Sequence, residues 1–429
     1  MRGKFFAALF TVVIICAFSL PAFPDDERKK NDELYTQLEL FTDALSMVES
    51  QYADLPKHQD LIYGALKGML VSLDPYSEFL DPERYKELKV DTEGKFGGLG
   101  IEIAIKDDLL TVMTPIEDTP AWKAGLKPQD RIVKIDGELT RNISAGDAVK
   151  KLRGRPHTEV MLTILRESEG RVFDVKIARD IIRIKDIKRA QILEEATGYI
   201  RLVEFRENTP VDFDAALIAL KKSGMDSLIL DLRNNPGGLL DVAVKVAERF
   251  IPEGKMVVST KGRVKTQDME FKSGQSAQKY LDMPLIVLVN EGSASGSEIV
   301  AGALQDYKRA VIVGSKTFGK GSVQSVLPLF DGSALKLTTS KYFTPSGRII
   351  HNQGIMPDIA VEAGKLEFTP GGPSAEDIFS GLKEKEPPKE KKPALPEEPA
   401  FDYKKDNQIV RSIDAIKAIK VYRELAAQK

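Results

Sequence analysis

The stretch NEGSASGSEIV carries three serines on alternate positions, Ser293, Ser295 and Ser297, after an apolar run and before a helical pattern. A serine hydroxyl in such a place can attack a carbonyl carbon as a nucleophile. It can equally start a helix, because Ser295 and Glu298 fit an S-x-x-E capping box, in which the serine oxygen satisfies an unpaired helix amide. The local pattern alone favours capping, so the chemistry depends on what else the chain supplies.

A nucleophilic serine needs a base. Histidine is the usual one, but His351, the only histidine after Ser295, lies in the polar, turn-like context GRIIHNQG. Lys320 is the next candidate, since no Asp or Glu occurs between Tyr307 and Phe330 to hold its proton. An ordinary lysine, with a pKa of about 10.4, is a free amine only about once in 2,500 at neutral pH, so a catalytic lysine must be desolvated. A solvated lysine in a Gly-Lys-Gly turn is the plain alternative.

The stretch DLRNNPGGLL is an apolar strand pattern that ends at Asp231, followed by a Pro-Gly-Gly turn and a helical pattern. Gly237 and Gly238 allow backbone amides to approach a substrate oxygen with no side chain in the way, as an oxyanion hole requires. A second amide could come from Gly296, at a helix N-terminus whose dipole favours developing negative charge. An ordinary turn is the simpler interpretation of these glycines.

Other motifs argue against several function classes. GSKTFGKGS has P-loop spacing at Gly314, Gly319 and Lys320, but Gly321 replaces the magnesium-binding Ser or Thr and a strand pattern follows, which argues against nucleotide binding. FGGLGIEI also leads into a strand rather than a helix. Cys16 is the single cysteine, and the three histidines lie far apart with no H-E-x-x-H pattern. With a net charge of −2 there is no electrostatic footprint for nucleic acid, and neither a metal nor a cofactor is expected.

The N-terminus, residues 1–22, is typical of an export signal, because Arg2 and Lys4 precede FFAALFTVVIICAFSL and small residues or turn formers follow. The apolar run is shorter than the roughly 20 residues that a spanning helix prefers, so a cleaved signal is favoured over an uncleaved membrane anchor. The mature protein is therefore expected outside the cytoplasm, in the periplasm or cell envelope. A helical segment at 26–89 follows, with apolar spacing of three and four.

Composition changes near Val90, where short β-rich runs separated by Gly, Pro and Asp predict a small β domain over 90–167. Over 168–364 the runs GYIRLVEF, DSLILDLR, PLIVLVN and AVIVG combine with helical patterns, which predicts an α/β core. The Pro-, Lys- and Glu-rich segment 365–399 is typical of an extended linker. A helix at 400–429 completes the chain, and its apolar positions suggest docking onto the core or an identical subunit: Ile409, Ile413, Ile416, Ile419 and Leu425.

Taken together, GGLGIEI, DLRNNPGGLL, NEGSASGSEIVAGALQD and GSKTFGKGSVQ resemble the C-terminal processing peptidases, also called tail-specific proteases, which are serine enzymes with a lysine base. The resemblance runs from about Glu33 to Val361. It implies an α/β fold with a crotonase/Clp-protease-like core, an inserted PDZ domain, and helical segments at both ends. It also selects Ser295 as the nucleophile, Lys320 as the base and Gln324 as a third residue. If that segment is a strand, Gln324 lies on the same face as Lys320 and can hydrogen-bond the amine or the hydroxyl.

The resemblance makes the β domain a PDZ module. Leu99, Gly100 and Ile101 then form the loop that receives a peptide carboxylate, and a helix around Val149 and Leu152 lines the side-chain pocket. The peptide would add as a strand to the sheet edge, so main-chain bonds would give affinity and a few side chains specificity.

With the export signal, the resemblance implies an exported, metal-free serine endopeptidase that captures the free C-terminal tails of protein or peptide substrates and cleaves elsewhere in them. The alternatives are a non-catalytic PDZ adaptor and a different acyl-group hydrolase. Sequence leaves open the physiological substrate, attachment to a membrane through the N-terminus, and the number of identical subunits.

Overall fold

The computed structural model describes residues 25–275, 278–364 and 401–427. The expected signal or anchor, with Cys16, and the expected linker lie outside these ranges. By their internal contacts, residues up to Met69 form one unit and residues from Leu70 onward form a second. None of the helices in the described ranges is both long enough and apolar enough to cross a membrane.

Two helices make up the first unit, as the apolar spacing of three and four predicts. α1 spans Asp25–Gln51 and α2 spans His58–Val71, whose last two residues belong to the second unit. Near the turn between them, the His58 Nε2 lies 2.8 Å from the Glu49 Oε1.

The second unit is built on a six-stranded sheet in the order β10-β11-β12-β15-β16-β19. β11 to β19 run parallel, and β10 joins antiparallel to β11. The four apolar runs that predict strands all lie in this sheet, which confirms the expected α/β core. The bounds are β10 Ile187–Ile192, β11 Thr197–Leu202, β12 Ser227–Asp231, β15 Leu285–Val289, β16 Val311–Gly314, β19 Ile359–Ala360, α6 Thr209–Lys222, α7 Leu240–Glu248 and α8 Gly296–Asp306.

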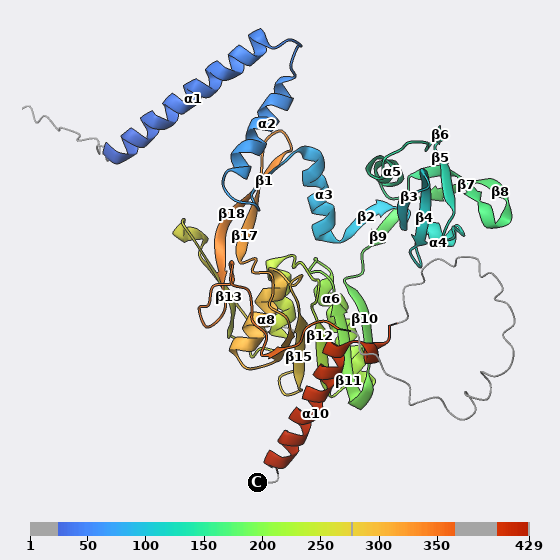
Figure 1. Ribbon diagram of the computed structural model, residues 1–429, viewed down its shortest axis with the longest axis vertical. Coiled ribbons are helices and arrows are strands. Elements are labelled where there is room, and N and C mark those ends of the chain that lie inside the picture. The colour runs from blue at the N-terminus through green and yellow to red at the C-terminus, as the bar shows by residue number, and fades with distance from the viewer. Residues whose placement is uncertain (1–24, 276–277, 365–400, 428–429) are drawn as a thin grey trace, which may run out of the picture. The chain divides into compact units, whose positions relative to one another are not determined.

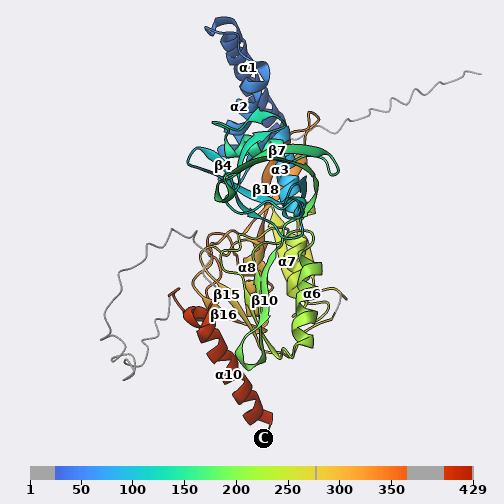
Figure 2. The same cartoon turned by 90° about the vertical axis from the view of Figure 1, so that its right-hand side faces the viewer.

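Both faces of this sheet are covered, because alternate residues of each strand point to opposite sides. On β12, Leu228 and Leu230 pack into the cluster that contains α6, α7 and α8, whereas Ile229 between them packs into a second cluster. That second cluster contains Ile409, Ile413 and Ile416 of the C-terminal helix. Figure 2 shows α6 and α7 on one side of the sheet and the C-terminal helix α10 on the other. The core is therefore a three-layer α/β/α arrangement.

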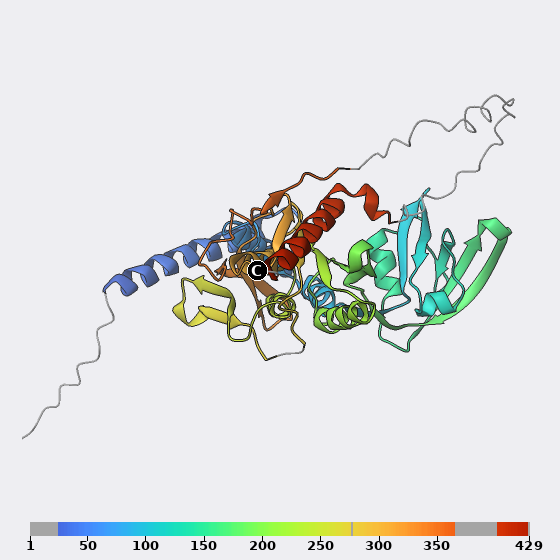
Figure 3. The ribbon, with the colours of Figure 1, turned by 90° about the horizontal axis from the view of Figure 1, so that it is seen from below.

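α10 spans Asn407–Ala427 and contacts β12, β15 and β16. Its docking onto the core is one of the two outcomes that its apolar spacing predicts. Ile419 is half-buried, but Leu425 is 57% exposed, because the last turns extend beyond the sheet (Figure 1). Figure 3 shows α10 from the side of its C-terminal end.

A second, five-stranded sheet has the order β1-β18-β13-β14, with β17 paired to β18 as an antiparallel hairpin. β17 is the strand that SVQSVLPL predicts. β1 comes from residues ahead of the β domain and pairs with β18, so the β domain is inserted into the chain of the core. The bounds are β1 Glu78–Leu80, β13 Met256–Gly262, β14 Met269–Lys272, β17 Ser322–Pro328 and β18 Ala334–Phe343.

A two-stranded ribbon, β2 and β9, leads into and out of the β domain (Figure 1). The sheet of this domain has the order β3-β4-β5-β7-β8, with β6 on β5. Sequence patterns place its end near Glu167, but β8 pairs with β7 over its whole length and continues the sheet to Ala178. The tight turn that closes this hairpin has Gly170 at φ 58. The bounds are α3 Pro82–Glu93, β2 Lys95–Gly98, β3 Ile101–Lys106, β4 Leu109–Pro115, α4 Pro120–Lys123, β5 Arg131–Ile135, β6 Glu138–Leu139, α5 Ala145–Leu152, β7 Glu159–Arg166, β8 Arg171–Ala178 and β9 Asp180–Arg183.

Candidate active site

Ser295 lies at the junction between β15 and α8, with φ 50 and ψ −110. A backbone in this region costs a non-glycine residue on the order of 1–3 kcal/mol and persists only where the surroundings impose it. Helix-capping serines normally have extended backbones, so capping alone does not require this conformation. The side chain is 8% exposed, whereas Ser293 and Ser297 are fully buried.

The hydroxyls of the three serines have different partners. Ser293 Oγ donates to the Leu232 carbonyl at 2.8 Å, and Ser297 Oγ donates to the Asn235 carbonyl at 2.9 Å. Both bonds fasten the start of α8 to the DLRNNPGG turn. Within the described residues, Ser295 Oγ donates to no carbonyl of this kind. Ser293 and Ser297 therefore have structural hydroxyls, whereas the Ser295 hydroxyl is not tied to a backbone carbonyl in this way.

Tyr342, on β18, lies against Ser295 and was not singled out by any sequence motif. Burial raises the pKa of Tyr342 to about 12, although a hydrogen bond with Ser295 acts in the opposite direction. Its backbone N–H donates to the Gly321 carbonyl, which follows Lys320 directly. Tyr342 is thus a neutral hydrogen-bonding partner for the Ser295 side chain.

The glycine turn packs directly on Ser295. Gly237 has φ +104, and a Cβ placed on it would lie 2.7 Å from the Ser295 Cβ, closer than real Cβ contacts come. Gly238 has φ +141, and a Cβ there would lie 2.2 Å from the Phe205 carbonyl oxygen. Both positions therefore require glycine, for backbone conformation and for space.

The amides of the three candidate oxyanion-hole glycines are not equivalent. The Gly237 N–H donates to the Asn235 Oδ1 at 2.9 Å, so in this state it is engaged rather than offered to a substrate. This differs from the expectation that Gly237 contributes its amide, because the side chain of Asn235, two residues earlier in the turn, accepts the hydrogen bond from that amide. For the N–H groups of Gly238 and Gly296, no partner occurs within the described residues. Gly296 is the first residue of α8, where helix amides lack intrahelical partners.

Glu298 is fully buried and its carboxylate accepts four hydrogen bonds. Oε2 accepts from the backbone N–H groups of Ser295 and Lys320, each over 2.9 Å. Oε1 accepts from the Gly319 N–H at 2.7 Å and the Thr317 hydroxyl at 2.6 Å. Burial raises the pKa of Glu298, while these four bonds partly offset that effect. The predicted capping box is present, and the same carboxylate also holds the loop that carries Lys320.

Lys320 is half-buried in the loop between β16 and β17. Its pKa lies below the usual lysine value, first because of burial and second because of the charge of Lys336, with Glu298 acting in the opposite direction. The ring of Tyr76 faces the Lys320 Nζ, with its centroid 5.3 Å away. No hydrogen bond joins the side chains of Lys320 and Ser295 in the described structure. In resting enzymes such catalytic contacts are often long and tighten only when substrate is bound.

His351 lies in a turn, as its sequence context predicts, and this turn packs beside the loop of Lys320. A Cβ on Gly321 would lie 2.1 Å from the His351 backbone nitrogen, so the two segments run in direct contact. The His351 Nδ1 is buried and has no hydrogen-bond partner within the described chain. The His351 imidazole is therefore an alternative to the Lys320 amine as the base, and an experiment must distinguish the two.

Gln324 lies on β17, and its hydrogen bonds in the described structure are to neither Lys320 nor Ser295. Its Nε2 donates to the Ser322 Oγ at 2.8 Å and to the Thr338 Oγ1 at 3.4 Å. Strand alternation does not relate Lys320 to Gln324, because Lys320 precedes β17. The pairing register shifts between Val323 and Gln324, where Thr339 is the extra residue on β18.

Arg233 fixes the DLRNNPGG turn to the C-terminal helix. Its guanidinium bonds both oxygens of Asp231, at 2.9 and 2.6 Å, and also the side chains of Asp406 and Gln408, at 3.1 and 2.8 Å. Tyr199 donates to the same Asp231 carboxylate at 2.7 Å. The C-terminal segment therefore supports the turn that contacts Ser295.

In the β domain, β3 is an edge strand, paired only with β4, and α5 packs against it. Leu99 and Leu152 are buried in the domain core, Ile101 and Val149 are half-buried, and Gly100 has φ +77. A Cβ on Gly100 would overlap the Thr119 side chain, whose hydroxyl donates to the Gly100 carbonyl at 3.1 Å. The residues expected to bind a tail therefore gather at one end of the edge between β3 and α5.

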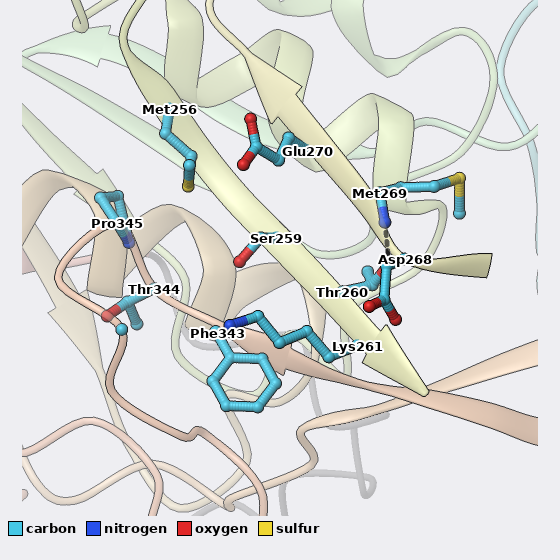
Figure 4. A pocket seen from close by; sticks show the side chains of 11 residues that line it. Met256, Ser259, Thr260, Lys261, Asp268, Met269, Glu270, Phe343, Thr344 and Pro345 are labelled. Atoms are coloured by element: carbon cyan, nitrogen blue, oxygen red, sulfur yellow. Dashed lines mark hydrogen bonds between the residues drawn. The ribbon is translucent and has the colours of Figure 1, made fainter. Parts of the chain in front are cut away.

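A cavity of about 500 Å³ lies elsewhere, between β13, β14 and the turn after β18 (Figure 4). Ser259, Lys261, Glu270 and Phe343 line it, and neither Ser295 nor Lys320 does. This cavity is therefore not the site of the chemistry. Across the described ranges, no three or more His, Cys, Asp or Glu side chains are grouped so that they could hold a metal ion.

Comparison with known proteins identifies the family of this chain. The model of peptidase family S41 matches residues 196–361, a PDZ domain model matches 111–166, and the model of the activating protease CtpB N-terminal domain matches 18–84. The carboxy-terminal-processing protease of Bartonella bacilliformis is 47% identical over 334 residues, which cover 76% of each chain. The chain belongs to the carboxy-terminal-processing proteases of peptidase family S41.

Other relatives of this carboxy-terminal-processing protease include the probable CtpA-like serine protease of Staphylococcus aureus strain MRSA252. It is 37% identical over 373 residues, which cover 85% of this chain and 74% of the relative. The solved photosystem II D1 C-terminal processing protease is 31% identical and covers 74% of this chain and 86% of its own, with a TM-score of 0.43. Membership of this family makes the protein a serine-type peptidase with a PDZ domain.

Proposed function

We propose that this carboxy-terminal-processing protease is an exported endopeptidase that uses Ser295 and Lys320 as a catalytic dyad. The observation that carries the proposal is the strained Ser295, pressed against Gly237 and tied through Glu298 Oε2 to the loop of Lys320. This arrangement presents one serine hydroxyl that is not bound to a backbone carbonyl, two amides without partners in the described residues, and one partly desolvated amine. These are the parts that acyl transfer from a peptide requires.

Lys320, as the free amine, takes the proton from Ser295 Oγ while the oxygen attacks the carbonyl carbon of the scissile bond. The N–H groups of Gly238 and Gly296 bind the resulting oxyanion, helped by the dipole of α8. The C–N bond then breaks, and protonated Lys320 gives its proton to the leaving amine. Water, deprotonated by Lys320, hydrolyses the ester on Ser295 and restores both side chains. Gln324 supports the base from β17 once substrate is bound.

The PDZ domain captures the tail of the substrate. A free carboxylate binds at Leu99 to Ile101, the peptide extends along the open edge of β3, and Val149 and Leu152 line the pocket for an apolar side chain. The N-terminal signal at 1–22 supports export to the periplasm or cell envelope.

The decisive experiment treats the full chain and its variants with a fluorophosphonate probe that acylates active serines, and with an unfolded protein substrate. Ser295→Ala should lose both labelling and cleavage, and Lys320→Met should lose both by several orders of magnitude. His351→Ala is the matched control and should retain most of the activity. If His351→Ala were inactive while Lys320→Met still cleaved, the base would be the imidazole and the dyad would be wrong.

A further inference from the structure

Residues 74–77, Asp-Pro-Tyr-Ser, form a turn between α2 and β1 that no motif in the sequence singled out. The Asp74 carboxylate closes this turn on itself. Its Oδ1 accepts from the N–H groups of Tyr76 and Ser77 at 2.8 and 2.9 Å, and its Oδ2 accepts from the Ser77 hydroxyl at 2.7 Å. The backbone around Tyr76 is therefore fixed by a single side chain.

The same turn is fastened to β18, next to the hairpin that follows Lys320. The Thr338 hydroxyl donates to Asp74 Oδ1 at 3.1 Å, and the Thr338 N–H donates to the Ser77 Oγ at 3.1 Å. Burial raises the pKa of Asp74, but the hydrogen bonds from Ser77, Tyr76 and Thr338 outweigh burial and hold it below its usual value. The anchor is thus a carboxylate at neutral pH. Gln324 also reaches Thr338, so the turn and the proposed third catalytic residue share one partner.

The anchored turn places the Tyr76 ring over the Lys320 Nζ, which lies 5.3 Å from the ring centroid. The side chain of Tyr76 is half-buried. The charged groups that act on Lys320 come from other elements, Glu298 from α8 and Lys336 from β18. Lys336 is itself 4.0 Å from Glu78, two residues after Tyr76. The ring therefore forms an uncharged side of the site. Its position depends on Asp74, which fixes the turn that carries Tyr76.

We infer that Tyr76, held by the Asp74–Thr338 anchor, is a further residue of the catalytic centre that orients Lys320 and shields its amine from water. This inference rests on the proposed role of Lys320 as the base. A carboxylate in this place would hold the proton of Lys320 and stop catalysis, whereas an aromatic face attracts the ammonium without accepting a full hydrogen bond. The lone pair of the free amine then stays available for the hydroxyl of Ser295. The phenol oxygen has no part in this role.

The test compares Tyr76→Phe, Tyr76→Leu and Tyr76→Ala in the full chain. Each is scored by kcat and KM on one substrate, and by the rate of fluorophosphonate labelling from about pH 5 to about pH 10. Tyr76→Phe keeps the ring and should remain within about threefold of the parent, whereas Tyr76→Ala should lower kcat at least about tenfold with little change in KM. Its pH profile should move toward alkaline pH, because water reaching the amine stabilises the ammonium more than the ring face does. Tyr76→Leu keeps the shield but loses the aromatic face, so its kcat should fall between them, without an alkaline shift of the profile.

Leu73→Ala is the matched control, since Leu73 is 59% exposed in the same loop and should leave rate and profile unchanged. Thermal melting separates the inference from a merely structural role. If Tyr76→Ala lowered the melting temperature but kept the pH profile of the parent, or kept the kcat of the parent, the inference would be wrong. Lys320→Met distinguishes a failure of the proposed dyad from a failure of the proposed role of Tyr76. An active Lys320→Met would overturn the proposed dyad, whereas an inactive Lys320→Met beside a fully active Tyr76→Ala would overturn only the role of Tyr76.

Discussion

The backbone N–H groups of Ser295 and Lys320 donate to the same oxygen, the Oε2 of Glu298, each over 2.9 Å. The two proposed catalytic residues lie on different elements, one before α8 and one before β17. A single buried carboxylate thus sets the backbone position of both. Hydrogen bonds to a charged acceptor are roughly twice as strong as neutral ones, so this link resists changes in the relative position of nucleophile and base.

We predict that Glu298→Gln will impair activity more than a single lost hydrogen bond would. A glutamine offers one acceptor oxygen, and its NH₂ group would face two of the four donors that now bind the carboxylate. Each buried donor left unpaired costs about 1–3 kcal/mol. kcat/KM should therefore fall at least about tenfold and the melting temperature should drop. Thr317→Val removes one of the four donors and is the graded control for kcat/KM, which should fall less. The melting temperature is not compared in this variant, because the Thr317 hydroxyl also accepts from the buried Ile355 N–H at 2.7 Å.

We predict opposite outcomes for the neighbouring serines. Ser293→Ala and Ser297→Ala should lower stability by about 1–3 kcal/mol each, since each removes a buried hydroxyl that pairs with a backbone carbonyl. Activity of the folded fraction should fall no more than about tenfold. Ser295→Ala should abolish probe labelling with little change in melting temperature. Complete loss of labelling in folded Ser293→Ala would mean that the wrong serine has been assigned.

Sequence reasoning anticipates the strands of the parallel sheet, because buried parallel strands read as continuous apolar runs such as LIVLV at 285–289. It also anticipates the glycine turn and the capping box. These features depend on residues close in the sequence. Asp74, Tyr76 and Tyr342 could not be found in this way, since each acts on a residue far away in the chain, and an Asp-Pro-Tyr turn or a strand tyrosine has no local signature of catalysis.

The argument that places Gln324 beside Lys320 depends on a strand that contains both residues. Strand periodicity places residues i and i+4 on one face only in a regular strand. Here Lys320 lies ahead of β17, so the periodicity of the strand does not relate it to Gln324. The hydrogen bond from Gln324 to Thr338 depends on the pairing of β17 with β18, and the segment itself does not encode its pairing partner.

The pH dependence of acylation follows from the lowered pKa of Lys320. Only the free amine accepts a proton, so labelling by the probe should rise as pH rises through the pKa of Lys320 and then level off. We predict that Lys336→Met will move this rise toward alkaline pH, because removing a nearby positive charge stabilises the ammonium. At neutral pH the variant should therefore be slower. Lys341→Met, at an exposed position of β18, is the control, and an equal shift there would contradict a specific effect of Lys336.

A pair of glycine substitutions separates two effects of an added methyl group: its steric contact with Ser295 and the strain of a positive φ. Gly237→Ala introduces a methyl group 2.7 Å from the Ser295 Cβ and also imposes φ +104 on an alanine. Gly224→Ala is the matched control, with φ +92 and open space around its Cβ. Both should lose about 1 kcal/mol of stability through the backbone term. Only Gly237→Ala should lose probe labelling, by at least about a hundredfold, because the oxyanion donors and the nucleophile are displaced.

Recognition of the tail predicts that amidating the C-terminus of a peptide substrate lowers cleavage at an internal bond. Amidation removes charge-assisted hydrogen bonds of about 1.5–3 kcal/mol each, so kcat/KM should fall at least about tenfold. Val149→Asp places a negative charge in the groove beside β3, which repels the carboxylate and should make free and amidated tails equal. Val172→Asp adds the same charge at an exposed position on β8, at the opposite edge of that sheet, and should keep the preference. Equal rates for free and amidated tails on the parent enzyme would show that the PDZ domain does not read the carboxylate.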